Sequence, residues 1–582
     1  MALELIVAID FGTTYSGVCW VVNCGERRIH LVTQWPGTSA SNSNVEKVPT
    51  LISYNGREPQ NWGYSVKRAE KNSFKWFKLL LESSHTLRAK AEPIVASTSL
   101  LRDLDKSVDD VATDFLHLLW EYAQDDIRKE YGPNWNTMYK VKVVLTVPAI
   151  WSPAAANKTK DVARAAGLPD NVFLVSEPEA AALAIMREKN AEGSSLKVGD
   201  SFVVCDAGGG TVDLVSYTIV SVDPLQLEEC VVGNGDLSGS VFVDAAFENY
   251  VKSIVGIEKY NSLRERNKEQ MMREFESTVK RNYSGDNQDC FVELVGVGDI
   301  PNQHVEDDQI ILTPDVMRNL FDDIVGRIIS LVKGQVDEAE RKGFNVKTIL
   351  LVGGFGCSNY LYKTLEDAHR EDGIQVLRGP GAWSSVCRGA ARWGLENAIA
   401  PTSQGSEVSK TLTVHIARYS LGICVSEPFD GNRHLEADRV FLHDRKFYAT
   451  NQMEWLLKKG ERVEVGTPLT AQLTKSIQLG TFDGLFDIGV RTFTAELYCC
   501  YDDHPPSRKE HSVQQLCTVE YAIKCGKLWI ENSYRDPLTR DKWRDVTFTL
   551  LVMLDSAILY FMVGYQGEPV AYTVAKYQNA LF

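Results

Sequence analysis

The sequence predicts an α/β fold built twice, as two lobes around a cleft, followed by a β-rich C-terminal domain. Two apolar strands predict the duplication. One ends at Asp10 and the other at Asp206, and each leads into a turn of glycine and threonine and a returning strand. Near residue 400 the pattern changes to short alternating segments separated by Gly, Pro and Asn, which favours β structure. We therefore expect lobe I at about 1–198, lobe II at about 199–400 and the β-rich domain at 410–582.

Length and charge limit the classes of function. At 582 residues the chain is too long for one hydrophobic core. A net charge of −15 argues against nucleic-acid binding, which needs a basic surface. The chain starts without a signal-peptide pattern, and Asp555 interrupts the most apolar late segment, so no membrane helix is expected. The cysteines lack metal-ligand spacing and fit a reducing compartment. We expect a cytoplasmic protein that binds neither membranes nor nucleic acid.

Lobe I begins with a hairpin, which we place at 6–22. A basic and aromatic helix is expected at 72–81. Val108 begins an amphipathic helix, because apolar residues recur from there at helical spacing. Residues 141–147 form a buried strand, and Ser152 caps a helix whose first residue is proline. The last expected elements of this lobe are a strand at 173–175 and a helix that starts near Glu177.

Lobe II repeats this plan. Its hairpin is expected at 202–217, followed by helical segments between 241 and 283. Thr313 starts a long helix, since a threonine cap followed by proline is a helix-start signal. Residues 348–352 form a buried strand that runs into Gly353 and Gly354.

The last part of the chain reads as a β sandwich or barrel. A linker is expected at 400–406, where Ala, Pro, Thr, Ser and Gly gather. Alternation at 411–416, 493–497 and 519–523 then predicts strands, and 546–563 predicts a strand–turn–strand pair.

The two hairpins indicate a nucleotide site between the lobes. Glycine lets the backbone turn tightly and bring its N–H groups close to a phosphate. A carboxylate cannot approach phosphate without a cation between them, so Asp10 and Asp206 together indicate Mg²⁺.

The motifs resemble those of the actin, sugar-kinase and heat-shock ATPase superfamily, and most closely those of the seventy-kilodalton heat-shock chaperones. The similarity covers about residues 1–398. It rests on Asp-Phe-Gly-Thr-Thr-Tyr-Ser at 10–16, Val-Pro-Ala at 147–149, Glu-Pro-Glu-Ala-Ala at 177–181, Asp-Ala-Gly-Gly-Gly-Thr-Val-Asp at 206–213 and Leu-Val-Gly-Gly at 351–354. The resemblance implies an actin-like ATPase fold that takes ATP or ADP with Mg²⁺.

The resemblance also implies which residues form the site. Asp10 and Asp206 would orient hydrated Mg²⁺, and Glu177 would be a hinge carboxylate near the metal shell. Lys78 would position the attacking water, with Lys75 as a competing match. The residues implied to hold the nucleotide are Gly12, Thr13, Thr14, Tyr15, Gly208, Gly209, Gly210, Thr211, Lys280, Arg281, Ser284, Gly353 and Gly354.

Two catalytic details stay open at the level of sequence. Thr211 is implied to help orient the water, but either Asp206 or Asp213 could be the general base. In the family, the segment that Lys280 and Arg281 match stacks on the adenine.

Three features depart from the family pattern. Trp383 stands where the family has an acidic residue, which affects contacts near adenosine. The family's acidic, leucine-rich interdomain linker is missing at 400–410, and no long charged helical segment follows the β-rich part. We therefore expect a divergent, lidless branch.

The resulting hypothesis is an ATP hydrolase whose nucleotide state controls a β-rich domain that binds a protein or peptide client, with chaperone-like activity. The alternatives are a nucleotide-gated binding protein with negligible hydrolysis and a small-molecule kinase of the same superfamily.

Overall fold

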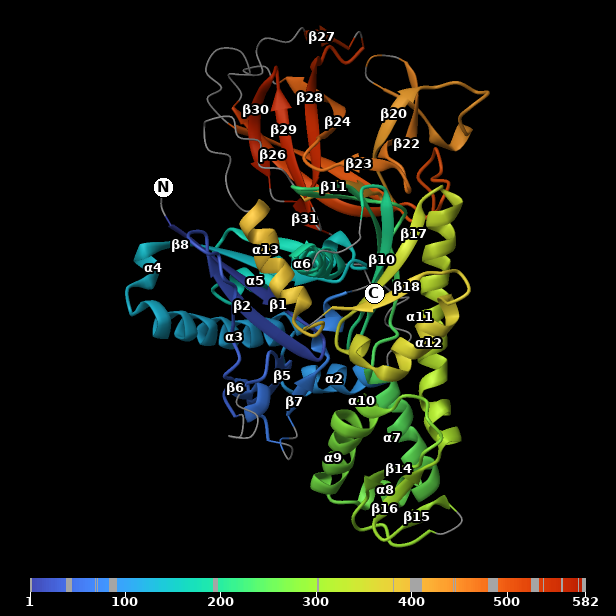
Figure 1. Ribbon diagram of the computed structural model, residues 1–582. Coiled ribbons are helices and arrows are strands. Elements are labelled where there is room, and N and C mark those ends of the chain that lie inside the picture. Colours follow the sequence, from blue (N-terminus) through green and yellow to red (C-terminus); the bar gives the residue numbers. More distant parts are fainter. Residues whose placement is uncertain are drawn as a thin grey trace. The chain divides into compact units, whose positions relative to one another are not determined.

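The computed structural model divides the chain into two compact units, residues 1–412 and 413–582 (Figure 1). The linker predicted at 400–406 lies outside the residues that the structure describes. Those residues are 3–37, 44–67, 70, 72–82, 92–191, 197–300, 303–379, 381–397, 411–442, 444, 446–479, 490–524, 533–536, 538–555, 558–573 and 575–577.

The sheet of lobe I contains the first predicted hairpin. Its strands are β1 (Leu3–Asp10), β2 (Tyr15–Val22), β3 (His30–Leu31), β4 (Val48–Pro49), β8 (Tyr139–Val147) and β9 (Val172–Ser176). The order is β3-β2-β1-β8-β9, and β4 also pairs with β2. β1 runs antiparallel to β2 and parallel to β8, and the register places Asp10 opposite Gly17.

The sheet of lobe II repeats that arrangement. Its strands are β10 (Asp200–Ala207), β11 (Val212–Val222), β12 (Leu225–Glu229), β13 (Asn234–Asp236), β17 (Asn345–Val352) and β18 (Gln375–Arg378). β10 pairs antiparallel with β11 and parallel with β17, as β1 does with β2 and β8. The predicted duplication, and with it the mixed α/β fold class, is confirmed.

Two helices join the lobes in one hydrophobic core. They are α6 (Glu177–Ala191) and α13 (Ser385–Asn397). The core takes residues from both sheets, such as Val144 and Val204, and from both helices. The helices cross closely, because a Cβ on Gly389 of α13 would lie 1.7 Å from the Ala180 carbonyl oxygen of α6. Only glycine fits at this crossing.

The helix caps predicted at Ser152 and Thr313 are confirmed. Ser152, Thr313 and Ser358 each accept a backbone N–H through the side chain. The other helices of this unit are α2 (Glu92–Asp103), α3 (Val108–Tyr131), α4 (Trp135–Met138), α5 (Pro153–Ala165), α7 (Val241–Val255), α8 (Ile257–Ser262), α9 (Glu265–Glu274), α10 (Lys280–Asn282), α11 (Pro314–Arg341) and α12 (Asn359–His369). Short helices are η2 (Gly63–Ser65), the π-helix η4 (Phe275–Val279) and η6 (Phe355–Cys357).

The helix predicted at 72–81 is wrong in its first half. Residues there form a strand, β7 (Ser73–Lys75), which pairs with β5 (Leu51–Asn55). Trp76 then has a left-handed φ of 61°, and a short 3₁₀ helix, η3 (Phe77–Leu81), follows. Pairing with a distant strand overrides the local helical pattern. β6 (Glu58–Trp62) also pairs with β5, and the remaining small sheet of the unit contains β14 (Cys290–Glu293), β15 (Val305–Glu306) and β16 (Gln309–Leu312).

The second unit is β-rich, as predicted. Its main sheets have the orders β21-β22-β20-β25-β26-β31 and β24-β28-β29-β30, with β27 on β28 and β19 on β23. The two main sheets share one core, which includes Val519 and Phe548. The strands are β19 (Leu412–Ile416), β20 (Ser420–Pro428), β21 (Arg439–Phe441), β22 (Phe447–Leu457), β23 (Arg462–Glu464), β24 (Leu469–Leu479), β25 (Val490–Cys500), β26 (Gln514–Lys524), β27 (Ser533–Arg535), β28 (Lys542–Asp555), β29 (Ile558–Tyr565), β30 (Glu568–Thr573) and β31 (Ala575–Tyr577), with one 3₁₀ turn, η7 (Glu436–Asp438).

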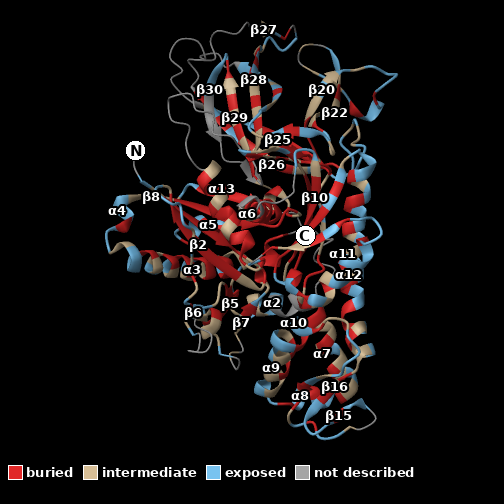
Figure 2. Ribbon diagram, viewed as in Figure 1, coloured by how far each residue is buried: buried red, intermediate tan, exposed pale blue. Residues whose placement is uncertain are grey.

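Burial is concentrated in the central strands. Figure 2 shows β8, β10 and α6 largely buried, whereas α11 and α12 keep exposed faces. Among the described helices, none combines the length and the apolar character that crossing a membrane requires.

Candidate functional site

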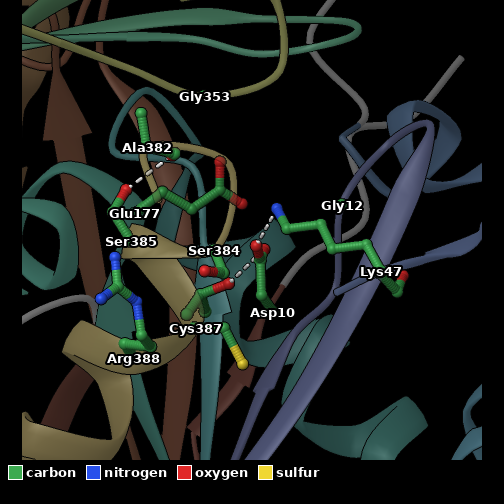
Figure 3. Close-up of polar contacts among 12 residues, drawn as sticks. Asp10, Gly12, Lys47, Glu177, Gly353, Ala382, Ser384, Ser385, Cys387 and Arg388 are labelled. Atoms are coloured by element: carbon green, nitrogen blue, oxygen red, sulfur yellow. Dashed lines mark hydrogen bonds and ion pairs between the residues drawn. The ribbon is translucent and has the colours of Figure 1, made fainter. Parts of the chain in front are cut away.

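Asp10 lies at the end of β1 and is only 3% exposed. Both oxygens of its carboxylate are held. The Lys47 ammonium donates to Oδ2 at 2.6 Å, and the Thr146 hydroxyl donates to Oδ1 at 3.2 Å. Figure 3 shows the Lys47 side chain reaching toward this carboxylate. Burial alone would lower the pKa of Lys47, but the charge of Asp10 raises that pKa above its usual value.

The turn after Asp10 leaves no room for a side chain at Gly12. A Cβ on Gly12 would lie 2.1 Å from the Tyr15 carbonyl oxygen. Thr50 fixes the turn from outside, because its N–H donates to the Thr14 carbonyl and its hydroxyl donates to the Gly12 carbonyl, both at 2.8 Å. The turn is thus held in one shape, and its inner face lines a pocket together with Thr13.

The second turn approaches the first from lobe II. A Cβ on Gly209 would lie 2.2 Å from the Thr14 hydroxyl oxygen, and one on Gly210 would lie 2.8 Å from a Thr13 methyl carbon. The turn is closed by the Gly208 N–H, which donates to the Thr211 carbonyl at 2.9 Å. The glycines predicted for phosphate approach therefore also let the two lobes meet.

A lysine–glutamate pair lies deeper in the same site. Glu177 is the first residue of α6, and its Oε1 accepts a hydrogen bond from the Lys78 ammonium at 2.6 Å. Lys78 is 1% exposed, and its Nζ lies 5.1 Å from the centre of the Trp151 ring. Lys75 is exposed, and its Nζ lies over Trp76. Of the two lysines that the sequence left open, the structure places Lys78 at the site.

Three buried carboxyl groups of the site, Asp206, Asp213 and Glu177, resist ionisation. Burial, and then the charges of Glu177 and Asp213, raise the pKa of Asp206 well above its usual range. Burial also raises the pKa of Glu177 to about 7, although Lys78 opposes the shift. Burial also raises the pKa of Asp213. The hydrogen bond that Asp213 Oδ1 accepts from the Ile150 N–H at 2.9 Å opposes this shift.

A bound cation would allow these crowded carboxyl groups to ionise. Four carboxylates (Asp10, Glu177, Asp206 and Asp213) face two paired ammonium groups, and carboxylate oxygens are the ligands that Mg²⁺ prefers. Among the described residues, however, no group of three or more acidic, His or Cys side chains is arranged to ligate a metal directly.

The third glycine motif closes the site from β17. Gly353 has a φ of +84°, and a Cβ there would lie 2.3 Å from Asp206 Oδ1 and 2.4 Å from the Ala207 carbonyl oxygen. Gly353 is therefore needed for close packing against the end of β10. Gly354 lines the pocket beside it.

The predicted adenine segment is only partly at the pocket. The Arg281 guanidinium lies 5.6 Å from the ring centre of Trp383, and that ring meets Tyr15 edge-on at 5.6 Å. The Lys280 ammonium is held by both oxygens of Asp244 at 2.7 Å. Ser284 donates to Asp286 instead and does not line the pocket.

These groups line one pocket with about 890 Å³ of space, its open mouth included. Lys78, Gly210 and Ser284, and the general-base candidate Asp213, are not part of its lining. Lys78 and Gly210 support it from behind, through Glu177 and Thr13, and Ser284 lies elsewhere. The lining residues that sequence reasoning did not place in the site are Lys47, Ser240, Glu276, Phe355, Cys357, Ser358 and Val386. For Lys47 the sequence holds no signal, since it lies in an irregular segment.

Both units of the chain match family models of known proteins. Residues 101–412 match the family model described as Hsp70 protein, and residues 415–579 match one described as a domain of unknown function. Heat shock 70 kDa protein 12B of Homo sapiens is 22% identical across 91% of this chain and 84% of its own length. Heat shock 70 kDa protein 12A of Mus musculus is 23% identical across 68% of this chain and 70% of its own length. The mitochondrial-type heat shock protein 70 of Encephalitozoon hellem is 29% identical across 49% of this chain and 44% of its own length.

Proposed function

The chain belongs to the Hsp70 family, and on that premise we propose that it binds and hydrolyses Mg-ATP in the pocket between its lobes. The observation that carries the proposal is the meeting of the two glycine turns, at Gly12–Tyr15 and Gly208–Thr211, beside a cluster of buried carboxylates. Such a site offers backbone N–H groups to phosphate and carboxylates to its cation.

The residues of this chain would divide the work between binding and catalysis. The amides of the two turns would bind the phosphates, and Asp10 and Asp206 would hold Mg²⁺. When bound, the metal would neutralise charge on the transferring phosphoryl group. Trp383 and Arg281 line the part of the pocket that takes the base.

Hydrolysis requires a water in line with the γ-phosphate. Lys78, fixed by Glu177, and Thr211 orient that water. Its oxygen bonds to the γ-phosphorus while the bond to the β–γ bridging oxygen breaks, and a carboxylate takes its proton. Asp206 and Asp213 are the two candidates, because both are buried and have raised pKa values.

The β-rich unit is the proposed client-binding part. It exposes large apolar side chains, including Leu435 at 55%, Phe441 at 51% and Phe447 at 46%. Exposed apolar groups of this kind suit a protein or peptide client. Nucleotide state would control this binding, and we propose that the protein works in the cytoplasm.

A specific contact favours a second candidate function. Lys47 already occupies the Asp10 carboxylate, as a metal ion would, so the protein could bind nucleotide as a signal and hydrolyse it negligibly.

Two measurements test these proposals. Millimolar Mg-ATP should raise the melting temperature of the full chain, and EDTA should reduce the shift. Single-turnover phosphate release then separates the two functions. No melting shift would refute nucleotide binding, and binding without phosphate release would leave the signalling function in place of the ATPase.

A further inference from the structure

Lys47 is a buried cation in the pocket that neither the glycine turns nor the family motifs indicate. It is 6% exposed and directly precedes β4. Its side chain passes over Gly17 of β2, because a Cβ there would lie 3.2 Å from Lys47 Cγ and 3.6 Å from Cε. Gly17 is the residue opposite Asp10 in the hairpin register. The absence of a side chain at Gly17 therefore opens the path along which Lys47 reaches Asp10.

The Lys47 ammonium has hydrogen-bonding capacity left over. An ammonium group carries three N–H donors. Among the described residues, Lys47 uses one, to Asp10 Oδ2 at 2.6 Å. Lys47 lines the pocket together with Gly12 and Thr13 of the first turn. The unused donors are thus available at the side of the pocket where the backbone amides await phosphate.

Of the two other buried lysines near the site, Lys78 does not line the pocket, whereas Lys280 does. Lys78 is held by Glu177 and covered by the Trp151 ring. Lys280 is held by both oxygens of Asp244. Lys47 is therefore the buried lysine best placed to meet an anion at the first turn.

We propose that Lys47 is a phosphate-binding residue that keeps Asp10 neutralised while the pocket is empty and binds the terminal phosphates of the nucleotide when it fills. A compact ammonium on a flexible stem suits this double task, because it can contact a carboxylate and a phosphate oxygen together. This inference rests on the proposed nucleotide binding and adds a contact that distinguishes nucleotides by their phosphate number.

Calorimetric titrations of the full chain with ATP, ADP and AMP test the contact. Lys47→Met should weaken ATP binding by roughly 10- to 100-fold, the scale of a hydrogen bond to a charged group. ADP binding should weaken less, and AMP binding should not change. Lys47→Arg should restore part of the ATP affinity. An equal loss for all three nucleotides, or no loss, would overturn the inference.

The matched control is Lys142→Met. Lys142 is also a buried lysine of the lobe I sheet, and it pairs with Glu4 at 2.8 Å, but it does not line the pocket. Its loss should leave the affinities for ATP, ADP and AMP unchanged. A similar ATP-specific loss in Lys142→Met would mean that removing any buried charge of this sheet weakens binding, and the inference would fail.

The Asp10→Asn background separates a direct contact from an effect through Asp10, and it also relieves the unpaired charge that Lys47→Met leaves behind. If Lys47 touches phosphate, Lys47→Met should still weaken ATP binding when added to Asp10→Asn. If its effect disappears there, Lys47 acts only through Asp10 and the inference fails.

A parent protein that binds no nucleotide would refute the proposed function itself, and this inference with it. A parent that binds ATP, with an unaffected Lys47→Met, would refute this inference alone.

Discussion

The two hairpins share one topology but neutralise their carboxylates differently. Asp10 of lobe I has an ammonium on one oxygen and a hydroxyl on the other. Among the described residues, Asp206 of lobe II has no ion pair to a lysine or arginine, and burial and neighbouring carboxylates raise its pKa. Duplication has preserved the backbone of the turn and the strand-end carboxylate. It has not preserved the charges around them.

The comparison assigns different tasks to the lobes. Lobe I brings its own cation, because the Lys47 ammonium pairs with the Asp10 carboxylate at 2.6 Å. In lobe II, Asp206 and Asp213 lie near Glu177, and their pKa values are raised. These two carboxyl groups therefore need a bound cation to ionise fully. We therefore expect the effect of added cations on the protein to arise mainly from lobe II.

The largest expected effect comes from Asp206→Asn, which removes the lobe II carboxylate while keeping its shape. Hydrolysis should fall roughly 100-fold or more, the scale of one lost electrostatic contact in a transition state. ATP affinity should fall much less, because the turn amides remain. Single-turnover phosphate release and calorimetry measure the two. Asp200→Asn, at the other end of the same strand, is the control and should change neither. Hydrolysis at the parent rate would mean that Asp206 does not serve the metal.

Gly209→Ala tests whether the two turns must touch. The new Cβ would collide with the Thr14 side chain, so the lobes must move apart. We expect a loss of roughly 1–3 kcal/mol in the free energy of unfolding, typical of overpacking, and weaker ATP binding. Chemical denaturation and calorimetry measure the two quantities. Gly326→Ala in α11 has open space around its Cβ and should be neutral or slightly stabilising. Equal behaviour of the two variants would show that the turns do not need to meet.

Glu177→Gln should flatten the pH dependence of stability. The pKa of Glu177 is raised from 4.5 to about 7, so the folded protein binds its proton more tightly than the unfolded chain does. The stability contributed by this group is therefore present at low pH and is lost as pH rises from about 4.5 to about 7. Asp206 and Asp213 act in the same direction. Melting temperatures of the nucleotide-free protein between pH 5 and 8 measure the slope. An unchanged slope in the variant would exclude Glu177 as its source.

The smallest effect on hydrolysis is expected from Thr146→Val, which removes the hydroxyl from Asp10 and leaves Lys47 in place. The loss of one buried hydrogen bond to a carboxylate should lower the free energy of unfolding by at most about 1.5–3 kcal/mol. Hydrolysis should stay within a few-fold of the parent, because lobe I still neutralises its carboxylate. A loss of activity as large as that of Asp206→Asn would show that the lobes are not so different.

Features encoded locally could be predicted from the sequence. The hairpins, the caps at Ser152 and Thr313 and the strand before Gly353 all depend on a few neighbouring residues, and the structure confirms them. The helix predicted at 72–81 failed because β7 gains its backbone partners from β5, which local periodicity cannot reveal.

The charges of the site could be predicted only in part. Asp10 and Asp206 stand at strand ends that the apolar pattern marks. Lys47 comes from an irregular segment, and its path to Asp10 depends on the missing side chain of Gly17. A single sequence gives no reason to connect these positions, because the contact exists only after the hairpin and β4 have paired.

The closeness of the Gly209 and Thr14 turns has a kinetic consequence. If the phosphates of a nucleotide are held between these turns, we expect their release to require that the lobes separate. Separation must bend or slide the helices α6 and α13, which cross at the Gly389–Ala180 contact and carry the core of both lobes. Product escape would then be slow compared with bond breaking, as in many enzymes whose turnover is set by an opening motion. A partner protein that stabilises the separated lobes would act as an exchange factor. It would accelerate product release without changing the rate of the hydrolysis step.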